Sequence, residues 1–262
     1  MRDYHVHTNY SDGSFLYNMV AAAADAGLDG VGIADHCVVS ERDGPRGQRR
    51  RLGFPLDEVY ERRRAAIADV REWFGIDIYD AVEMDYDPRD ETEIRAFLDE
   101  AGFDYAVGSV HWIDGVNVHA ERYFADCSER ERRAAVDEYF EKLVALVESE
   151  LFEVAAHLDL VERNPPLQGC ATEDHYRAVA GALADSRTVP ELNAGRVLDD
   201  YGRFHPHPDF LSVLREYDVP LTVGSDSHEP GEIGPRVDRI GSFLAERGIE
   251  PVDVDVEAAG RV

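Results

Sequence analysis

The sequence contains very little lysine, few cysteines and no long apolar segment. Lys142 is the only lysine among 262 residues, so arginine supplies nearly all of the positive charge. Cys37, Cys127 and Cys170 are widely spaced and form no Cys-x-x-Cys pair, so we expect free thiols and neither a disulfide framework nor a zinc knuckle. No apolar run approaches the ~18 residues that a membrane-spanning helix needs, and the first residues lack the pattern of a signal peptide. We therefore expect a cytoplasmic protein without a membrane partner.

Acidic side chains dominate the charge of the chain. The 54 aspartates and glutamates outnumber the 27 arginines and lysines and give a formal net charge of −27. They are spread along the whole sequence, whereas a disordered acidic tail would gather them at one end. Such a negative surface repels nucleic acids and anionic membranes, so we expect neither as a partner. We interpret the excess of acids as a halophilic adaptation to a salt-rich cytoplasm.

Seven short apolar segments alternate with helical patterns, which is typical of an α/β fold with a parallel sheet, either open or closed into a barrel. The predicted strands are a first one that runs into His5, followed by residues 30–34, 76–82, 105–110, 152–156, 188–192 and 219–224. The predicted helices are residues 15–26, 56–74, 90–101, 129–150, a segment ending near 185, a short segment ending at 217, and 236–247. No repeat or linker divides the chain, so residues 1–262 are expected to form a single domain.

Several segments lack the hydrophobic periodicity of a helix or a strand. Residues 41–54 are polar and rich in glycine and arginine, which predicts a mobile surface loop. Residues 112–128 are expected to form a long loop, and residues 249–262 a polar C-terminal tail. His205 and His207 form a second His-x-His motif, but the prolines around them and the lack of a preceding strand favour a plain loop.

Most of the predicted strands end at a histidine, a carboxylate or an amide. In an extended segment, residues two apart point to the same side, so His5 and His7 direct both imidazoles at one point. In α/β folds, the active site gathers at the carboxyl ends of the parallel strands. The residues at these ends are His5, Asp35-His36, Glu83, His111, His157, Asn193 and Asp226-x-His228. Scattered structural histidines would not all occur at the same end, so the pattern predicts a metal site at the C-terminal rim.

The ligand types indicate which metals and which chemistry this rim supports. Imidazoles combined with the carboxylates of Asp12, Glu83 and Asp226, without a thiolate, suit Zn, Mn or Fe in hydrolytic sites. A mononuclear catalytic site takes three protein ligands, so nine candidates imply two or three divalent ions, with Glu83 placed to bridge a pair. Such a cluster binds phosphate oxygens and activates water, which predicts hydrolysis of a small phosphorylated substrate. The nine predicted ligands are His5, His7, Asp12, His36, Glu83, His111, His157, Asp226 and His228.

The motifs around these ligands resemble those of the polymerase-and-histidinol-phosphatase (PHP) superfamily over residues 5–228. They are His5-x-His7-Thr8, Ser11-Asp12-Gly13, Ala34-Asp35-His36, Glu83, Gly108-Ser109-Val110-His111, His157 and Gly224-Ser225-Asp226-Ser227-His228. The resemblance implies a distorted (β/α)7 barrel with a trinuclear metal site. It assigns one ion to His5, His7, Glu83 and Asp226, a second to Glu83, His111 and His157, and a third to Asp12, His36 and His228.

Within this superfamily, the chain is most similar to the histidinol-phosphatase branch. The similarity lies in its length, in the absence of appended domains and in the motif at residues 108–111 followed by Asp114-Gly115. Members of the branch hydrolyse L-histidinol phosphate to L-histidinol and phosphate in histidine biosynthesis. The expected mechanism is attack of a metal-bridging hydroxide on phosphorus, in which Glu83 and Asp226 act through the metals and no phosphoenzyme forms.

Polar residues near the ligands are candidates for supporting roles. Arginine is suited to hold a phosphate because its guanidinium binds oxyanions in a bidentate manner. Arg163, six residues after His157, and Arg196 are the best-placed candidates, and an ordinary surface ion pair is the alternative for each. Asp35 is expected to orient a histidine ligand. Asn193 either does the same through its amide or satisfies buried backbone groups.

Three other functions stay open on the sequence alone. The first is a PHP-type phosphoesterase acting on a nucleotide or another small phosphoester, although the lack of a basic face argues against long nucleic acids. The second is a non-catalytic PHP module that binds metal or a partner. The third is a redox metalloenzyme, which shares the ligand types but for which the sequence offers no cofactor motif. The number of subunits is left open as well.

Overall fold

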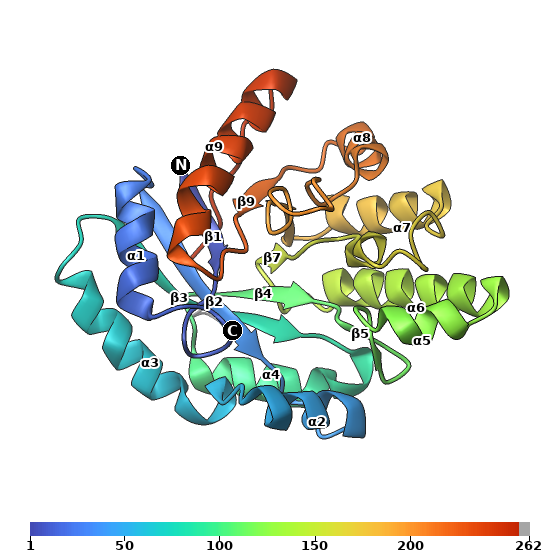
Figure 1. Ribbon diagram of the computed structural model, residues 1–262, viewed down its shortest axis with the longest axis horizontal. Coiled ribbons are helices and arrows are strands. Elements are labelled where there is room, and N and C mark those ends of the chain that lie inside the picture. The colour runs from blue at the N-terminus through green and yellow to red at the C-terminus, as the bar shows by residue number, and fades with distance from the viewer. Residues whose placement is uncertain (257–262) are drawn as a thin grey trace.

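The computed structural model describes residues 1–256 as a parallel sheet of seven strands that curves into a nearly closed barrel (Figure 1). The strands follow the order β1-β2-β3-β4-β7-β8-β9. Their bounds are β1 Arg2–Val6, β2 Gly30–Cys37, β3 Asp77–Asp85, β4 Tyr105–Ser109, β7 Val154–Ala155, β8 Val189–Asn193 and β9 Thr222–Gly224. The first and last strands meet through backbone hydrogen bonds, in which His7 donates to Ser227 at 2.9 Å and Asp226 donates to His5 at 2.7 Å. The predicted fold class is confirmed.

The helices pack around the outside of this sheet (Figure 1). Their bounds are α1 Leu16–Asp25, α2 Asp43–Leu52, α3 Leu56–Arg71, α4 Glu91–Ala101, α5 Glu121–Asp126, α6 Glu129–Glu148, α7 Glu173–Ala184, α8 Pro208–Glu216 and α9 Pro230–Arg247. Because helices cover one face and the barrel interior covers the other, strands such as β2 are buried along almost their whole length. Within residues 1–256, none of the helices combines the length and the apolar character needed to cross a membrane. The three cysteines are free thiols, as predicted.

The segment 41–54 does not form the predicted loop, because Asp43–Leu52 is the helix α2. This helix is polar and buries little more than a single proline, so hydrophobic periodicity could not reveal it. Gly53 ends it with a φ of +72°, the left-handed conformation typical of glycine at a helix C-terminus. Arg49 fixes the helix to the barrel by donating to the carbonyl of Val38 at 2.8 Å. Side-chain anchoring thus replaces the missing apolar face.

Two further predicted boundaries are wrong. The expected loop 112–128 contains an antiparallel hairpin, β5 Trp112–Ile113 and β6 Val116–Asn117, followed by α5. The helix α9 begins at Pro230, whereas the sequence predicts a start at residue 236. Proline is tolerated in the first turn of a helix, and a capping box between Glu229 and Glu232 satisfies the first backbone N–H groups.

The amino ends of the strands form a floor, which consists of Arg2, Tyr4, Tyr79, Tyr105 and Asp253. Tyr4 donates from its hydroxyl to Asp253 at 3.0 Å, and Arg2 donates to the same carboxylate at 2.8 Å. The hydroxyl of Tyr105 donates to the carbonyl of Tyr4 at 2.6 Å. Val254 is buried in the same cluster. Of the predicted tail 249–262, the part up to residue 256 therefore packs on the barrel, and residues 257–262 lie outside the described residues.

Candidate metal centre

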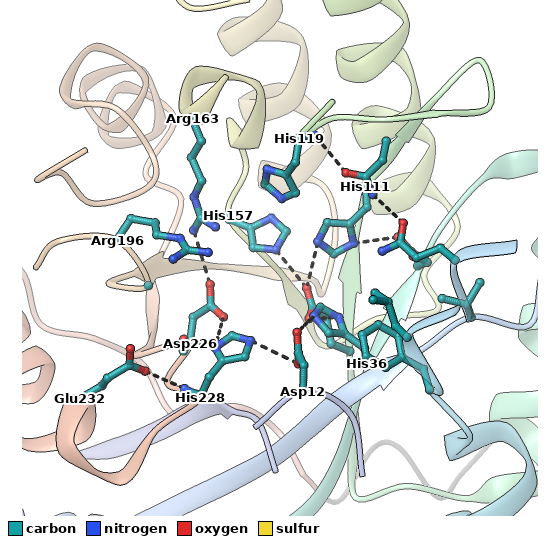
Figure 2. A pocket seen from close by; sticks show the side chains of 18 of the residues that line it. Asp12, His36, His111, His119, His157, Arg163, Arg196, Asp226, His228 and Glu232 are labelled. Atoms are coloured by element: carbon teal, nitrogen blue, oxygen red, sulfur yellow. Dashed lines mark hydrogen bonds and ion pairs between the residues drawn. The ribbon is translucent and has the colours of Figure 1, made fainter. Parts of the chain in front are cut away.

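One rim of the barrel brings together the nine predicted ligands (Figure 2). Strands β1, β2 and β3 carry His5, His36 and Glu83 near their carboxyl ends. The segments that follow β1, β4, β7 and β9 carry the other six, which are His7, Asp12, His111, His157, Asp226 and His228. The parallel arrangement of the strands thus turns widely separated sequence motifs into one cluster of imidazoles and carboxylates.

The two imidazoles of the first motif converge on one point. His5 Nε2 and His7 Nε2 lie 3.1 Å apart, and both side chains are fully buried. Two nitrogens bound to one Zn ion at about 2.1 Å would themselves be roughly 3 Å apart, so the spacing fits a shared ion. Glu83 Oε2 lies 3.3 Å from His5 Nε2 and 3.5 Å from His7 Nε2. These three side chains form a potential ligand group at the centre of the rim.

Glu83 lies between this group and a second set of imidazoles. Its Oε1 is 3.0 Å from His157 Nε2 and 3.8 Å from His111 Nε2. Its Oε2 is 2.7 Å from His36 Nδ1. A single buried carboxylate therefore faces imidazoles on several sides, which is the arrangement that a bridging ligand requires.

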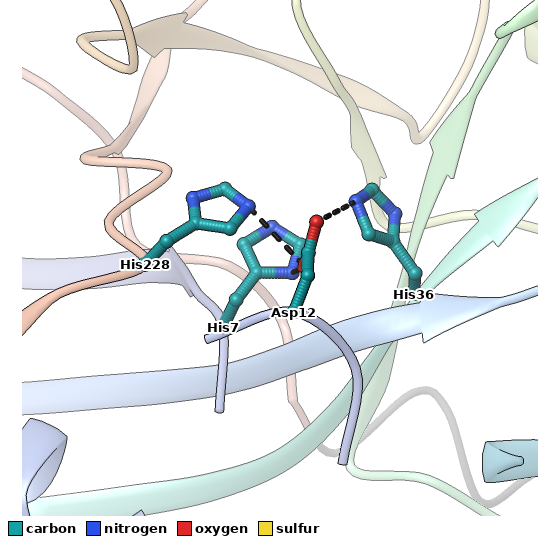
Figure 3. Close-up of side chains that lie close together, drawn as sticks. All are labelled: His7, Asp12, His36 and His228. Atoms are coloured by element: carbon teal, nitrogen blue, oxygen red, sulfur yellow. Dashed lines mark ion pairs between the residues drawn. The ribbon is translucent and has the colours of Figure 1, made fainter. Parts of the chain in front are cut away.

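The loop after β1 adds a third group around Asp12 (Figure 3). The nearest ring nitrogens to its carboxylate are His228 Nε2 at 3.4 Å, His36 Nε2 at 3.8 Å and His7 Nδ1 at 3.8 Å. His7 thus presents one nitrogen to each of two neighbouring groups. The structure adds His7 to the set of Asp12, His36 and His228 that the resemblance implies.

Asp226 is held in an unusual backbone conformation. Its φ is +52°, and that of His157 is +25°, in the region that residues other than glycine rarely adopt. Asp226 Oδ1 lies 3.4 Å from His7 Nε2. A side chain at Gly195 would place Cβ only 2.3 Å from Asp226 Oδ2, so the glycine makes room for the carboxylate. Strained conformations at two candidate ligands are a feature that functional sites often show.

Two carboxylates that the sequence analysis missed orient the imidazoles. Glu191 in β8 lies 3.0 Å from His5 Nδ1 and accepts from the backbone N–H of His157 at 3.0 Å. Asp85 lies 2.8 Å from His111 Nδ1. Such contacts at Nδ1 leave Nε2 of each ring free to ligate. A fully buried acid within the apolar segment 188–192 was the available signal for Glu191.

Among the described residues, no hydrogen bond joins Asp35 directly to a histidine, and its link to His7 Nδ1 passes through Ser11 Oγ, which lies 3.4 Å from that nitrogen. The carboxylate of Asp35 accepts hydrogen bonds from Thr8 N at 2.6 Å, from Ser11 Oγ at 2.9 Å and from the buried Arg63 at 2.9 Å. These contacts fix the turn that presents Asp12. Asp35 therefore supports the site through the backbone of the loop.

Arg163 points into the site from a short helical turn, Leu160–Arg163 (Figure 2). Its guanidinium donates to Asn193 Oδ1 at 3.1 Å and to Asp226 Oδ2 at 3.4 Å. Its Nε donates to His205 Nε2 at 2.8 Å, while His205 Nδ1 lies 2.5 Å from Asp159. Residues 202–207 form a loop, as predicted, but His205 is fully buried within it and pairs with Asn193 through an isolated bridge.

Asn193 and Arg196 occupy the same side of the site. Asn193 Nδ2 donates to Asp226 Oδ2 at 3.2 Å and to Glu191 Oε1 at 2.7 Å, so this amide contacts carboxylates and not a histidine. Arg196 lines the pocket and also forms an exposed ion pair with Asp199 at 2.9 Å. Both alternatives that the sequence left open for Arg196 are compatible with this position.

Opposite charges decide the ionisation of the buried carboxylates. Burial opposes ionisation of Glu83, but the neighbouring imidazoles, above all that of His36, hold its pKa well below the ordinary value. The pKa of Asp226 is likewise held low against burial, through its contact with His7. Burial lowers the pKa of His7 itself to about 4. Against the effect of burial, Glu191 and Glu83 raise the pKa of His5, and Glu83 raises that of His36 to about 10, so metal binding by these imidazoles would release protons.

Two buried polar atoms of the ligand set test whether metal ions fit here. Within residues 1–256, Glu83 Oε2 and His157 Nδ1 form no hydrogen bond. A buried polar atom without a partner costs about 1–3 kcal/mol, and more when it is charged. The donor types and the charge fit a cluster that divalent ions complete, and the short contact of Glu83 Oε2 with His36 Nδ1, at 2.7 Å, is an ion pair and not a regular hydrogen bond.

A pocket of about 260 Å³ leads to this cluster. It is lined by candidate ligands, by Arg163 and Arg196 on one side, and by residues of α2 and of the hairpin on the other. Its volume lies near the lower end of the range for small-molecule sites, which is roughly 300–1,000 Å³. The pocket therefore has about the size of a small-molecule site.

Comparisons with known proteins agree with this geometry. The probable histidinol-phosphatase of Deinococcus radiodurans is 27% identical over 218 residues, which cover 82% of this chain and 80% of the relative. The histidinol-phosphatase of Lactococcus lactis is 27% identical over 243 residues, which cover 86% and 83% of the two chains. The crystal structure of the Lactococcus lactis histidinol phosphate phosphatase, complexed with zinc, L-histidinol and phosphate, is similar with a TM-score of 0.75 and 22% identity over 97% of this chain and 95% of that one.

The family model described as PHP domain matches residues 3–194. This range includes the segments that carry His5, Asp12, Glu83 and His157, and it extends over well more than half of the sequence. The resemblance of the motifs is thereby confirmed, and the chain belongs to the PHP domain family.

Proposed function

We propose that this protein is a metal-dependent phosphomonoesterase that hydrolyses L-histidinol phosphate to L-histidinol and phosphate in histidine biosynthesis. The observation that carries the proposal is the buried carboxylate of Glu83, which faces the imidazoles of His5, His36 and His157. Relatives named histidinol-phosphatase, which align over most of the chain, support the choice of substrate.

We propose two or three divalent ions, Mn, Zn or Fe, as the cofactor. Three potential ligand groups at the rim support this number, and Glu83 belongs to two of them. One ion would take His5, His7, Glu83 and Asp226, a second Glu83, His111 and His157, and a third Asp12, His36 and His228. When bound, such ions lower the pKa of water and neutralise charge on phosphate oxygens.

The chain's own residues hold the substrate and the ligands in place. Arg163 is directed at the site by Asn193 and His205, and its charge attracts a phosphate dianion. Glu191 fixes the orientation of His5 and the backbone of His157. Because the ligand set supplies the means to activate water, no serine, cysteine or aspartate nucleophile is needed and no phosphoenzyme is expected.

We further propose a salt-rich cytoplasm as the working environment. A net charge of −27 on a 262-residue chain causes self-repulsion that salt screens. The midpoint of thermal unfolding is therefore expected to rise as KCl increases from about 0.1 M to about 2 M. A midpoint that is constant or falls over this range would contradict the proposal.

The test of the proposed function is phosphate release from L-histidinol phosphate, compared with nucleoside monophosphates and simple phosphoesters, in molar KCl with Mn. We expect a marked preference for L-histidinol phosphate that disappears on chelation. A preference for nucleotides would support the metal site and contradict the proposed role in histidine biosynthesis. No release from any substrate by metal-loaded protein would favour a binding module.

A further inference from the structure

The pocket at the rim has two chemically different ends. Arg163 and Arg196 line one end, on the side that also carries Glu232 (Figure 2). The other end, which we name the α2 wall, consists of Val38, Gln48, Leu52, Phe54 and Asn117. Figure 2 shows Arg163 and Arg196 on one side of the candidate ligands and His36, against which Phe54 stacks, on the other. Because no residue of the α2 wall is charged, a phosphate dianion is attracted to the arginine end.

Contacts between α2 and the hairpin fix the α2 wall in place. A side chain at Gly44 would bring Cβ within 2.7 Å of the carbonyl oxygen of Gly115 and 3.0 Å of the ring of Trp112, so helix and hairpin are in close backbone contact. Asn117 Nδ2 donates to Gln48 Oε1 at 3.1 Å. Two side-chain amides are therefore held together at the edge of the pocket by a preformed framework.

The α2 wall keeps hydrogen-bond donors and apolar surface available. The amide oxygens of Gln48 and Asn117 are both used, the first by Asn117 and the second by the backbone N–H of His119 at 2.9 Å. Within residues 1–256, Gln48 Nε2 donates to no protein acceptor. Leu52 is 55% exposed and lines the pocket, whereas Phe54 is only 6% exposed and its ring stacks on that of His36 at 5.3 Å. This surface suits a flat ring with an acceptor atom.

We propose that the α2 wall binds the leaving-group part of the phosphoester and that Gln48 determines specificity by donating from Nε2 to a ring nitrogen. The inference rests on the proposed function, in which that ring is the imidazole of L-histidinol. A neutral imidazole has one nitrogen that accepts and one that donates, so it can pair with the free amide N–H. Its apolar faces match Leu52, the exposed apolar side chain of the α2 wall. The phosphate then lies toward the arginine end.

The two products of the reaction probe the two ends separately. Product inhibition by L-histidinol and by inorganic phosphate is measured during hydrolysis of L-histidinol phosphate by the metal-loaded enzyme. Gln48→Leu keeps the size of the side chain and removes its amide, so it is expected to raise the inhibition constant of L-histidinol about tenfold and that of phosphate less than about twofold. Arg163→Gln is expected to raise the inhibition constant of phosphate about tenfold and that of L-histidinol less than about twofold. Arg50→Ala, on the exposed side of α2, is the matched control and changes neither constant.

The outcomes distinguish this inference from the proposed function. Equal weakening of both inhibitors by Gln48→Leu, or no change in either, contradicts the α2 wall as the leaving-group site. The same holds for a wild-type enzyme that hydrolyses L-histidinol phosphate but is not inhibited by L-histidinol at concentrations far above KM. A different result would show that the proposed function itself is wrong: the wild-type enzyme would release no phosphate from L-histidinol phosphate. The inference about the α2 wall would then be overturned as well.

Discussion

The polar side chains at the two ends of the barrel differ in how they are paired. At the floor, the hydroxyls of Tyr4 and Tyr105 and the guanidinium of Arg2 each have a protein partner. At the rim, imidazoles approach one another to 3.1 Å, and Glu83 Oε2 has no hydrogen bond among the described residues. Apart from the buried Nε of Arg2, these polar groups of the floor are paired within the chain, whereas the rim brings together side chains suited to bind a cation.

This difference suggests that the floor contributes to the stability of the fold and the rim to its function. Burying like groups together costs free energy unless a ligand compensates for it. A polar cluster that is fully satisfied within the chain contributes to folding, and one that is left incomplete is a candidate for binding. Substitutions at the rim should therefore affect activity and metal affinity, and substitutions at the floor should affect stability alone.

The largest effect is expected for Asp226→Asn. The amide keeps the shape of the side chain but removes the negative charge from a candidate ligand, so activity on L-histidinol phosphate should fall about 10³-fold or more. Circular dichroism should show an unchanged fold. Asp253→Asn at the floor is the matched control and should keep full activity. Unchanged turnover in the Asp226 variant would contradict the assignment of the rim as a metal centre.

Glu191→Gln should weaken metal binding without removing a ligand. The carboxylate contacts His5 Nδ1 and the backbone N–H of His157, and loss of such an orienting partner reduces metal affinity about 10- to 100-fold. Titration of the metal-free protein with Zn or Mn measures the change. Affinity equal to that of the wild type would show that Glu191 has only a structural role.

A smaller effect is expected for His205→Ala. Arg163 loses the acceptor of its Nε–H, so its guanidinium is held less firmly toward the phosphate, and kcat/KM should fall about tenfold, mainly through KM. His207→Ala, in the same segment but at its more exposed histidine, is the control. A fall in kcat with KM unchanged would argue against a role in phosphate binding.

At the floor, Tyr4→Phe removes one hydroxyl and its hydrogen bond to Asp253. The free energy of unfolding should fall by about 1 kcal/mol, and kcat/KM should stay the same, because the ligands are at the opposite end. Urea unfolding and the phosphatase assay on the same preparation measure both. A large loss of activity without loss of stability would contradict the claim that substitutions at the floor affect stability alone.

The smallest effect concerns Asp87, a carboxylate near the rim that is fully paired. Burial alone would raise its pKa, but hydrogen bonds from Arg89 and Lys142 outweigh burial and hold the pKa well below the ordinary value. A depressed pKa stabilises the fold above the unfolded-state value of about 3.9 and loses this contribution as pH falls below it.

Asp87→Asn should therefore destabilise the protein at pH 7 and progressively less below about pH 4. Urea unfolding at several pH values checks this, with the exposed Asp43→Asn as control. An equal loss at all pH values would show that the ion pairs of Asp87 do not stabilise the fold, although they lie close to the site.

The sequence predicted the strands and the gathering of the candidate ligands at their carboxyl ends, because both follow local rules. Parallel strands buried on both faces read as apolar runs, and their ends carry the His, Asp and Glu residues that the rim needs. The helix α2 followed no such rule, since its anchors are side-chain contacts such as that of Arg49 with Val38. The role of His205 depends on Arg163, which lies 42 residues away in sequence, and no local pattern reveals such a pair.

The abundance of acidic residues is another reason why the sequence could not predict the whole site. Glu191 and Asp35 differ in role although both are buried acids near the ends of strands. Glu191 faces a ligand imidazole, and Asp35 faces the turn that carries Asp12. Their roles depend on which side of the strand meets which loop, and that is a property of the closed barrel. In a chain with 54 acids, residue type alone could not select either one.

The most direct test of the rim as a metal centre is activity measured against bound metal. Metal-free protein is prepared with a chelator, titrated with Mn or Zn, and assayed for phosphate release from L-histidinol phosphate while bound metal is determined by elemental analysis. We predict no activity without metal and a rise that saturates at two or three equivalents per chain. Full activity of the metal-free protein, or binding of metal without any gain in activity, would contradict the account.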